Sequence, residues 1–105
     1  MVETIYEVIE RLEHTQPKSV EEARGFLNSL SEEVQEQLIA SIYIGKDHIH
    51  SQKFNHDAEV SRLTTGHIEK DEYPAVLSKY ASSLRLYFGS LKRCAGNESF
   101  DLTKL

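Results

Sequence analysis

The sequence contains one cysteine, two prolines and no long apolar run. Because Cys94 has no second cysteine to pair with, an internal disulfide is excluded, and a reducing, cytoplasmic location is expected. No stretch approaches the ~20 apolar residues that span a bilayer. The first residues lack a basic region followed by an apolar one, so neither a membrane span nor a signal peptide is expected.

Acidic residues are missing from one segment and abundant elsewhere. Residues 1–72 contain fifteen acids and seven bases, a net charge of −8, whereas residues 73–97 contain four bases and no acid. The whole chain carries −5. Nucleic-acid binding needs a basic surface for phosphate contacts, so this balance argues against a nucleic-acid partner.

Catalytic and cofactor-binding sequence motifs are also absent. The chain has no glycine-rich phosphate loop, nucleophile elbow or dinucleotide-binding fingerprint, and it has no internal repeat. Apolar residues recur at helical spacing and not in strand-like alternation, which predicts an all-α fold of about five helices. We expect residues 1–95 to form one domain, with 96–105 as a loose C-terminal tail and no cofactor.

The central element of this fold is predicted at residues 32–45. Between Leu38 and Ile44 only Ser41 is polar, and a helix that is apolar on all sides is buried on all sides. Ser31 is a typical N-cap, and Gly45 is expected to end the helix. Two helices, at 3–14 and from residue 20 to about 30, are predicted to precede it.

Two further helices are predicted after the central one. Asn55 or Asp57 is expected to cap a helix that runs to about Thr65. Pro74 then opens a long helix that ends at Gly96. Gly89 lies inside this last helix, where glycine costs about 1 kcal/mol relative to alanine, so a kink is expected there.

Residues 23–46 carry a family resemblance. Gln35-Glu36-Gln37-Leu38-Ile39-Ala40, followed by Tyr43-Ile44-Gly45-Lys46, resembles the Gln-x-x-Leu-Val-Ala…aromatic-aliphatic-Gly-Arg helix of an uncharacterised family of small bacterial domains. Lys46 replaces the family's arginine, and Asp47 stands where glycine is common. The resemblance implies a helical fold and a bacterial origin, and it implies no activity.

Three histidines and two acids could supply metal ligands. Asp47, His48, His50, His56 and Asp57 lie within eleven residues, and zinc takes imidazole and carboxylate ligands. No pair has the i, i+4 spacing that chelates from a helix, so we interpret these histidines as solvated loop residues and predict no metal site. The set His50, His56-Asp57 and Asp71 resembles helical metal-dependent phosphohydrolases, but its histidines are too close in sequence. The remaining histidine of interest is His67.

Arg62 and His67 form an Arg-x4-His pattern. It resembles the motif of small helical ribonucleases, in which the histidine acts in acid–base chemistry from the same helix as the arginine. Gly66 directly precedes the histidine and favours the end of a helix, so this activity is retained as the alternative. Cys94 follows Lys92 and Arg93, which would lower its pKa, but no catalytic partner accompanies it and an inert thiol is expected.

The last predicted helix carries the candidate binding site. Tyr73, Tyr80 and Tyr87 recur every seven residues, as do Arg85 and Lys92, and seven residues are almost two helical turns. Tyrosine and arginine are enriched at binding hot spots. We therefore predict a non-catalytic interaction or regulatory domain that binds an acidic protein through this stripe, the partner being another protein or a second copy of the chain. The alternative is that the tyrosines only flank the core.

Overall fold

The computed structural model describes residues 3–55 and 57–105. This part of the chain forms five α-helices and four short 3₁₀ helices, without a strand, which confirms the predicted all-α class. In order, they are α1 (Ile5–His14), α2 (Val20–Asn28), α3 (Glu32–Asp47), η1 (Arg62–Thr65), η2 (Lys70–Glu72), α4 (Tyr73–Lys79), η3 (Ala81–Ser83), α5 (Leu84–Asn97) and η4 (Leu102–Lys104).

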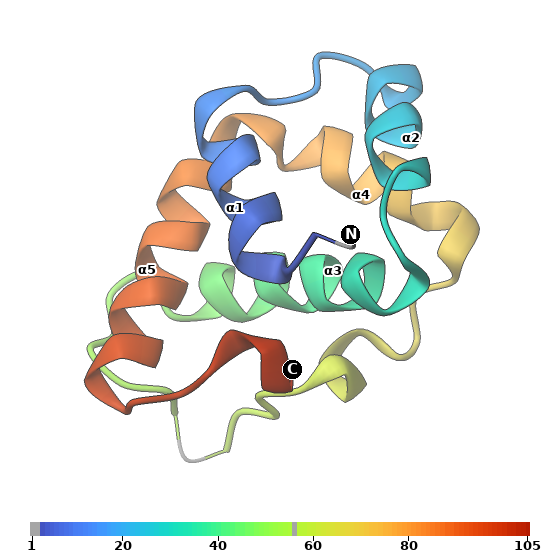
Figure 1. The fold of residues 1–105 in the computed structure, drawn as a ribbon. Coiled ribbons are helices and arrows are strands. Elements are labelled where there is room, and N and C mark those ends of the chain that lie inside the picture. Colours follow the sequence, from blue (N-terminus) through green and yellow to red (C-terminus); the bar gives the residue numbers. More distant parts are fainter. Residues whose placement is uncertain (1–2, 56) are drawn as a thin grey trace.

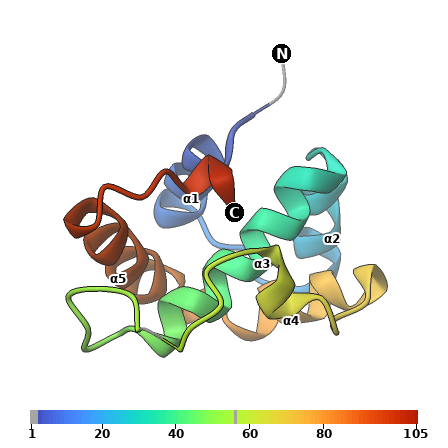
Figure 2. The ribbon, with the colours of Figure 1, turned by 90° about the horizontal axis from the view of Figure 1, so that it is seen from below.

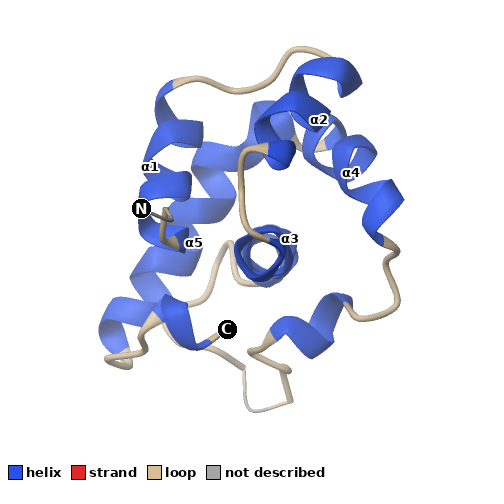
Figure 3. Cartoon of the chain, turned by 45° about the vertical axis from the view of Figure 1, so that its right-hand side comes forward, coloured by secondary structure: helices blue, strands red, loops and turns tan. Residues whose placement is uncertain are grey.

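Helix α3 lies at the centre of the fold, as predicted. Figure 3 looks almost along its axis and shows the other elements arranged around it. Leu38, Ile39 and Ile42 are fully buried, while Tyr43 is only half-buried. The hydroxyl of Ser31 accepts a hydrogen bond from the Val34 amide at 3.3 Å and caps the helix.

Gly45 does not end α3, contrary to the prediction. The helix continues to Asp47, and no glycine of the described residues has a positive φ. Gly45 is buried against α5, where the Ser90 hydroxyl donates to its carbonyl oxygen at 2.6 Å. Because glycine has no side chain, the main chain of α5 can approach α3 closely at Gly45.

The predicted helix between residues 55 and 65 is wrong. Only η1 forms at its end, and the preceding loop is held by side chains instead of helical hydrogen bonds. The amide of Asn55 donates to His48 Nε2 at 3.0 Å, and Arg93 donates to the carbonyl oxygens of Ile49 and Ser51. Leu63 is 76% exposed, so the segment lacks the buried stripe that stabilises a helix.

The predicted long helix is broken at Tyr80 into α4 and α5. Tyr80 leaves the helical conformation at ψ 7°, and the next three residues, Ala81–Ser83, form η3. The break lets α4 pack on α2 while α5 packs on α3 and α1 (Figure 1). Helix α5 continues through Gly89, where a kink is expected from the sequence.

The C-terminal residues are not a loose tail, which corrects the expected boundary at residue 95. Helix α5 extends to Asn97, and the chain then turns back toward α1 and α3 (Figure 2). Leu102 and Leu105 are 1% and 3% exposed. The Gln37 amide donates to the Thr103 carbonyl at 3.1 Å, and the Leu102 amide donates to the Tyr6 hydroxyl at 2.8 Å. Two apolar anchors and these bonds hold the segment on the core.

Candidate functional site

Three tyrosines meet where the chain breaks between α4 and α5. The Tyr80 ring lies 5.7 Å from that of Tyr43 on α3 and 5.8 Å from that of Tyr87 on α5. Both pairs are edge-to-face, an arrangement favoured by the charge distribution of aromatic rings. Tyr80 and Tyr43 are half-buried and Tyr87 is buried, so Tyr80 and Tyr43 form the outer part of the group.

Two lysines flank this aromatic group. The ammonium of Lys79 lies 5.2 Å from the centre of the Tyr80 ring, and that of Lys46 lies 5.8 Å from it. Both distances fall in the range of cation–π interactions. Lys46 lies one helical turn after Tyr43 on α3, so both side chains are on the face of α3 that meets Tyr80. We call Tyr43, Lys46, Lys79, Tyr80 and Tyr87 the Tyr80 cluster.

The charge of the Tyr80 cluster is not neutralised by ion pairs. Within residues 3–55 and 57–105, the four basic side chains in ion pairs are Arg11, Arg62, Lys70 and Lys92. Lys46 and Lys79 are exposed and form no ion pair with another described residue. The cluster therefore presents two positive charges beside an aromatic surface, on a chain whose net charge is −5.

The phenol of Tyr43 stays protonated in this environment. Its pKa is raised above the ordinary value, first by burial and then by the neighbouring Tyr80 and the negative charge of Glu72. A protonated phenol both donates and accepts hydrogen bonds. The cluster consequently combines cations, apolar rings and a neutral hydroxyl.

The structure separates the five residues predicted as a binding stripe. Tyr80 and Tyr87 belong to the cluster, but Tyr73 lies apart at the start of α4 and is only 5% exposed. Its pKa is raised by burial and then by Glu36 and Glu32, which face it from α3. Tyr73 is thus a core residue.

Arg85 and Lys92 lie on the opposite side of α5 from Tyr87. Successive residues of a helix are 100° apart, so Arg85 and Tyr87 differ by about 200° around the axis. Lys92, two turns from Arg85, forms an ion pair with Glu13 of α1 at 2.7 Å. The two bases therefore lie on the side of α5 that faces α1. The tyrosine series and the basic series, each with seven-residue spacing, do not form one surface.

Lys46, Lys79 and Tyr43 were missed as site residues. Their proximity depends on the break at Tyr80 and on the packing of α5 against α3. The i, i+3 spacing of Tyr43 and Lys46 was visible in the sequence and places both on one helix face. This spacing did not indicate which other part of the chain packs against that helix face.

The ribonuclease alternative lacks the helix on which it depends. Arg62 lies in η1, whereas Gly66 and His67 form a turn after it. The Arg62 guanidinium donates to Glu36 of α3 at 3.3 Å, and His67 is exposed. The arginine thus links η1 to α3, a structural role.

The histidine segment also differs from its interpretation as solvated. His48 is 1% exposed; its Nδ1 lies 2.7 Å from the Ile44 carbonyl oxygen, and its Nε2 accepts from the Asn55 amide. His50, Asp57 and Asp71 are exposed, and His56 lies outside the described residues. No three His, Cys, Asp or Glu side chains gather as metal ligands within residues 3–55 and 57–105.

Cys94 is fully buried in α5. Burial raises the pKa of its thiol; Arg93 opposes this increase, and Glu98 adds to it. The expected lowering of the pKa by adjacent bases is therefore outweighed by desolvation.

Comparisons with protein-family models, curated proteins and solved structures find no match to this chain. The resemblance of residues 23–46 to a bacterial family stays a prediction. No helix among the described residues has the length and apolar character needed to cross a membrane.

Proposed function

We propose that this chain is a non-catalytic interaction domain that binds an acidic protein segment at the Tyr80 cluster. One observation carries the proposal: two exposed lysines converge on a half-buried tyrosine and lack ion-pair partners within residues 3–55 and 57–105. All seventeen acids of the chain lie outside residues 73–97, the segment that contains Lys79 and Tyr80. An acidic ligand would supply the missing counter-charge.

The chemistry of the cluster fits a protein ligand. The rings offer a rigid apolar surface with few rotatable bonds, and tyrosine is enriched at binding hot spots. In the complex the tyrosine rings would exclude water from the contact. The lysine ammonium groups would then attract the partner's carboxylates more strongly than they do in water. A partner segment with an acidic residue next to an apolar one would engage both features.

A bacterial cytoplasmic setting is part of the same proposal. It is supported by the resemblance of residues 23–46 and by the single thiol, Cys94, which is typical of a reducing compartment. A nucleic-acid ligand is disfavoured, since the net charge of −5 repels the phosphate backbone.

Site-specific crosslinking in cells tests the proposal. Ser82 is exposed two residues from Tyr80, so a photoreactive amino acid at this position should crosslink to the partner without altering the cluster. The same group at exposed Lys104 serves as the positional control. Mass spectrometry would then identify the protein captured.

Charge reversal makes the crosslinking result specific. Lys46→Glu with Lys79→Glu should abolish the Ser82 crosslink, whereas Lys104→Glu should retain it. Equal crosslinking at both positions, or a Ser82 product that survives reversal of both lysines in a folded variant, would show that the cluster is not the binding surface.

A further inference from the structure

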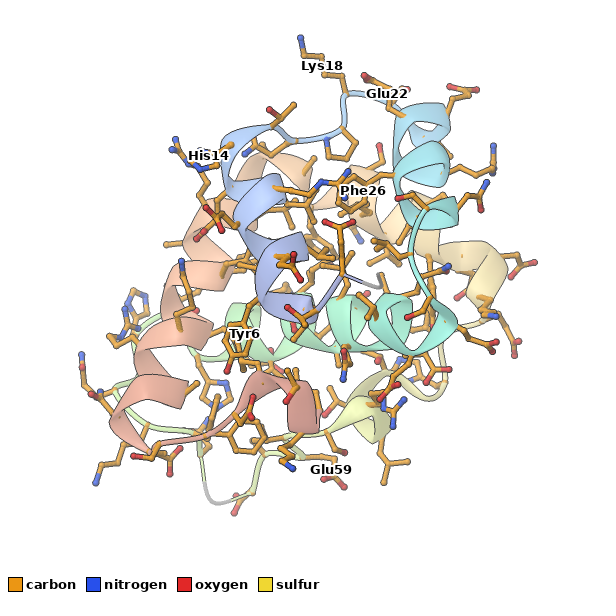
Figure 4. All side chains as sticks on the ribbon, in the orientation of Figure 1. Tyr6, His14, Lys18, Glu22, Phe26 and Glu59 are labelled. Carbon is orange, nitrogen blue, oxygen red and sulfur yellow. The ribbon has the colours of Figure 1, made fainter. Side chains whose placement is uncertain are left out.

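A groove runs along the other face of the molecule, between α1 and α2. Two hollows of about 330 and 160 Å³ share Thr15 and Phe26 in their walls, and a third of about 270 Å³ adjoins the first through Arg11 and His14. Figure 4 shows Phe26 between the two helices. We call this continuous depression the Phe26 groove.

The groove is aromatic at one end, where Phe26 lines two hollows, and acidic at the other, where three glutamates line the third hollow along α1. Phe26 is half-buried, and the Arg11 guanidinium lies 4.6 Å from the centre of its ring, so this ring already accepts a cation. Four acids and one base line the hollows, which gives −3 with His14 neutral; these are Glu3, Glu7, Glu10, Glu22 and Arg11. An aromatic surface that adjoins an acidic one suits lysine, which packs its apolar stem on the ring and places its ammonium near the carboxylates.

We propose that the Phe26 groove of one copy receives the Tyr80 cluster of a second copy. This inference rests on the proposed function and names the partner of the same site. Charge complementarity carries it, because the cluster adds two unpaired positive charges and the groove has a net negative charge. The lysines of one copy would insert between the acids of the next.

The positions of the two surfaces determine the form of the assembly. Helix α1, which lines the groove, and helix α4, which ends at Lys79, lie on opposite sides of α3 (Figure 2). A copy bound through its cluster keeps its groove free for a third copy. Such a head-to-tail contact extends into a chain or closes into a ring.

Sedimentation velocity of the purified protein tests this assembly. Species larger than a monomer should grow with protein concentration at about 0.05 M salt and shrink at about 0.5 M, where exposed charges are screened. Lys46→Glu/Lys79→Glu should remove the cluster contact, and Glu10→Lys/Thr15→Lys should remove the groove contact. Charge changes of the same sign elsewhere, Lys104→Glu and Glu69→Lys, should leave assembly unchanged, with helical circular dichroism confirming that each variant folds.

Mixing the two defective variants provides the decisive measurement. The cluster variant keeps an intact groove and the groove variant keeps an intact cluster, so together they should form a 1:1 complex and nothing larger. Each alone should remain monomeric, with association weakened about tenfold or more.

Three results would overturn the inference: a wild type that stays monomeric at low salt, assembly that persists in either variant, or a mixture that forms no complex. The proposed function is tested separately from self-assembly. A monomeric wild type that still gives a Ser82 crosslink to a different protein would retain binding at the cluster and eliminate only self-assembly.

Discussion

Gly45 and Tyr87 bring the main chains of α3 and α5 into direct contact. A Cβ atom on Gly45 would lie 2.8 Å from the carbonyl carbon of Tyr87 and 3.2 Å from its Cα, and it would overlap the carbonyl oxygen. These neighbours are backbone atoms, which cannot move aside by a rotamer change. The crossing of the two helices therefore requires glycine at this position.

Gly45→Ala should accordingly destabilise the fold. We expect a loss of about 1–3 kcal/mol in the free energy of unfolding, the usual cost of overpacking a core. Gly89→Ala is the control, because a Cβ there meets nothing within 4 Å, and alanine should stabilise α5 by about 0.5–1 kcal/mol. Urea titration followed by circular dichroism measures both, and equal stability of the two variants would contradict the predicted contact.

The histidine pair His48 and His50 offers a second matched comparison. His48→Ala removes the partner of the Asn55 amide and of the Ile44 carbonyl oxygen, and leaving such groups unpaired costs about 1–3 kcal/mol. His50 is exposed, and His50→Ala should change stability by less than about 0.5 kcal/mol. Similar unfolding midpoints for both variants would show that His48 does not hold the loop.

The pKa of Cys94 leads to a prediction for alkaline solution. Because the folded thiol has a pKa above its ordinary value of 9.0, its contribution to stability is complete below that pH and is lost as pH rises through the folded pKa. Thiolate absorbance should therefore appear at higher pH in the native protein than in urea. Native and unfolded chains that titrate together would exclude burial as the controlling factor.

The sequence correctly predicted the structural features that depend on residues close together in the chain. The apolar circumference of residues 38–44 identified the buried helix, and Ser31 identified its cap, since both act within a few residues. The break at Tyr80 was not predicted, because the apolar series on its two sides has the same seven-residue spacing. Only packing on different neighbours, α2 for α4 and α3 for α5, separates the two halves.

The candidate site was predicted only in part, because it also depends on packing between segments far apart in the sequence. Tyr80 was identified from its spacing, but Lys46 joins it through the crossing of α3 and α5, which no local pattern encodes. Arg85 was placed beside the tyrosines on the assumption of one continuous stripe. On the actual α5 it lies about 200° from Tyr87.

Tyr80 and Arg85 should therefore differ in their effect on binding, although both were predicted in one stripe. Tyr80→Ala removes the ring that both lysines flank, and loss of a hot-spot side chain costs about 2 kcal/mol or more of binding energy. Arg85→Glu alters an exposed side chain on the α1 side, so capture at the Ser82 crosslinker should stay near wild type. Crosslink yield at equal expression measures both, and circular dichroism checks that Tyr80→Ala is folded. A larger loss for Arg85→Glu would return the binding surface to the outer face of α5, because only a partner on that face would contact residue 85 more closely than the Tyr80 ring.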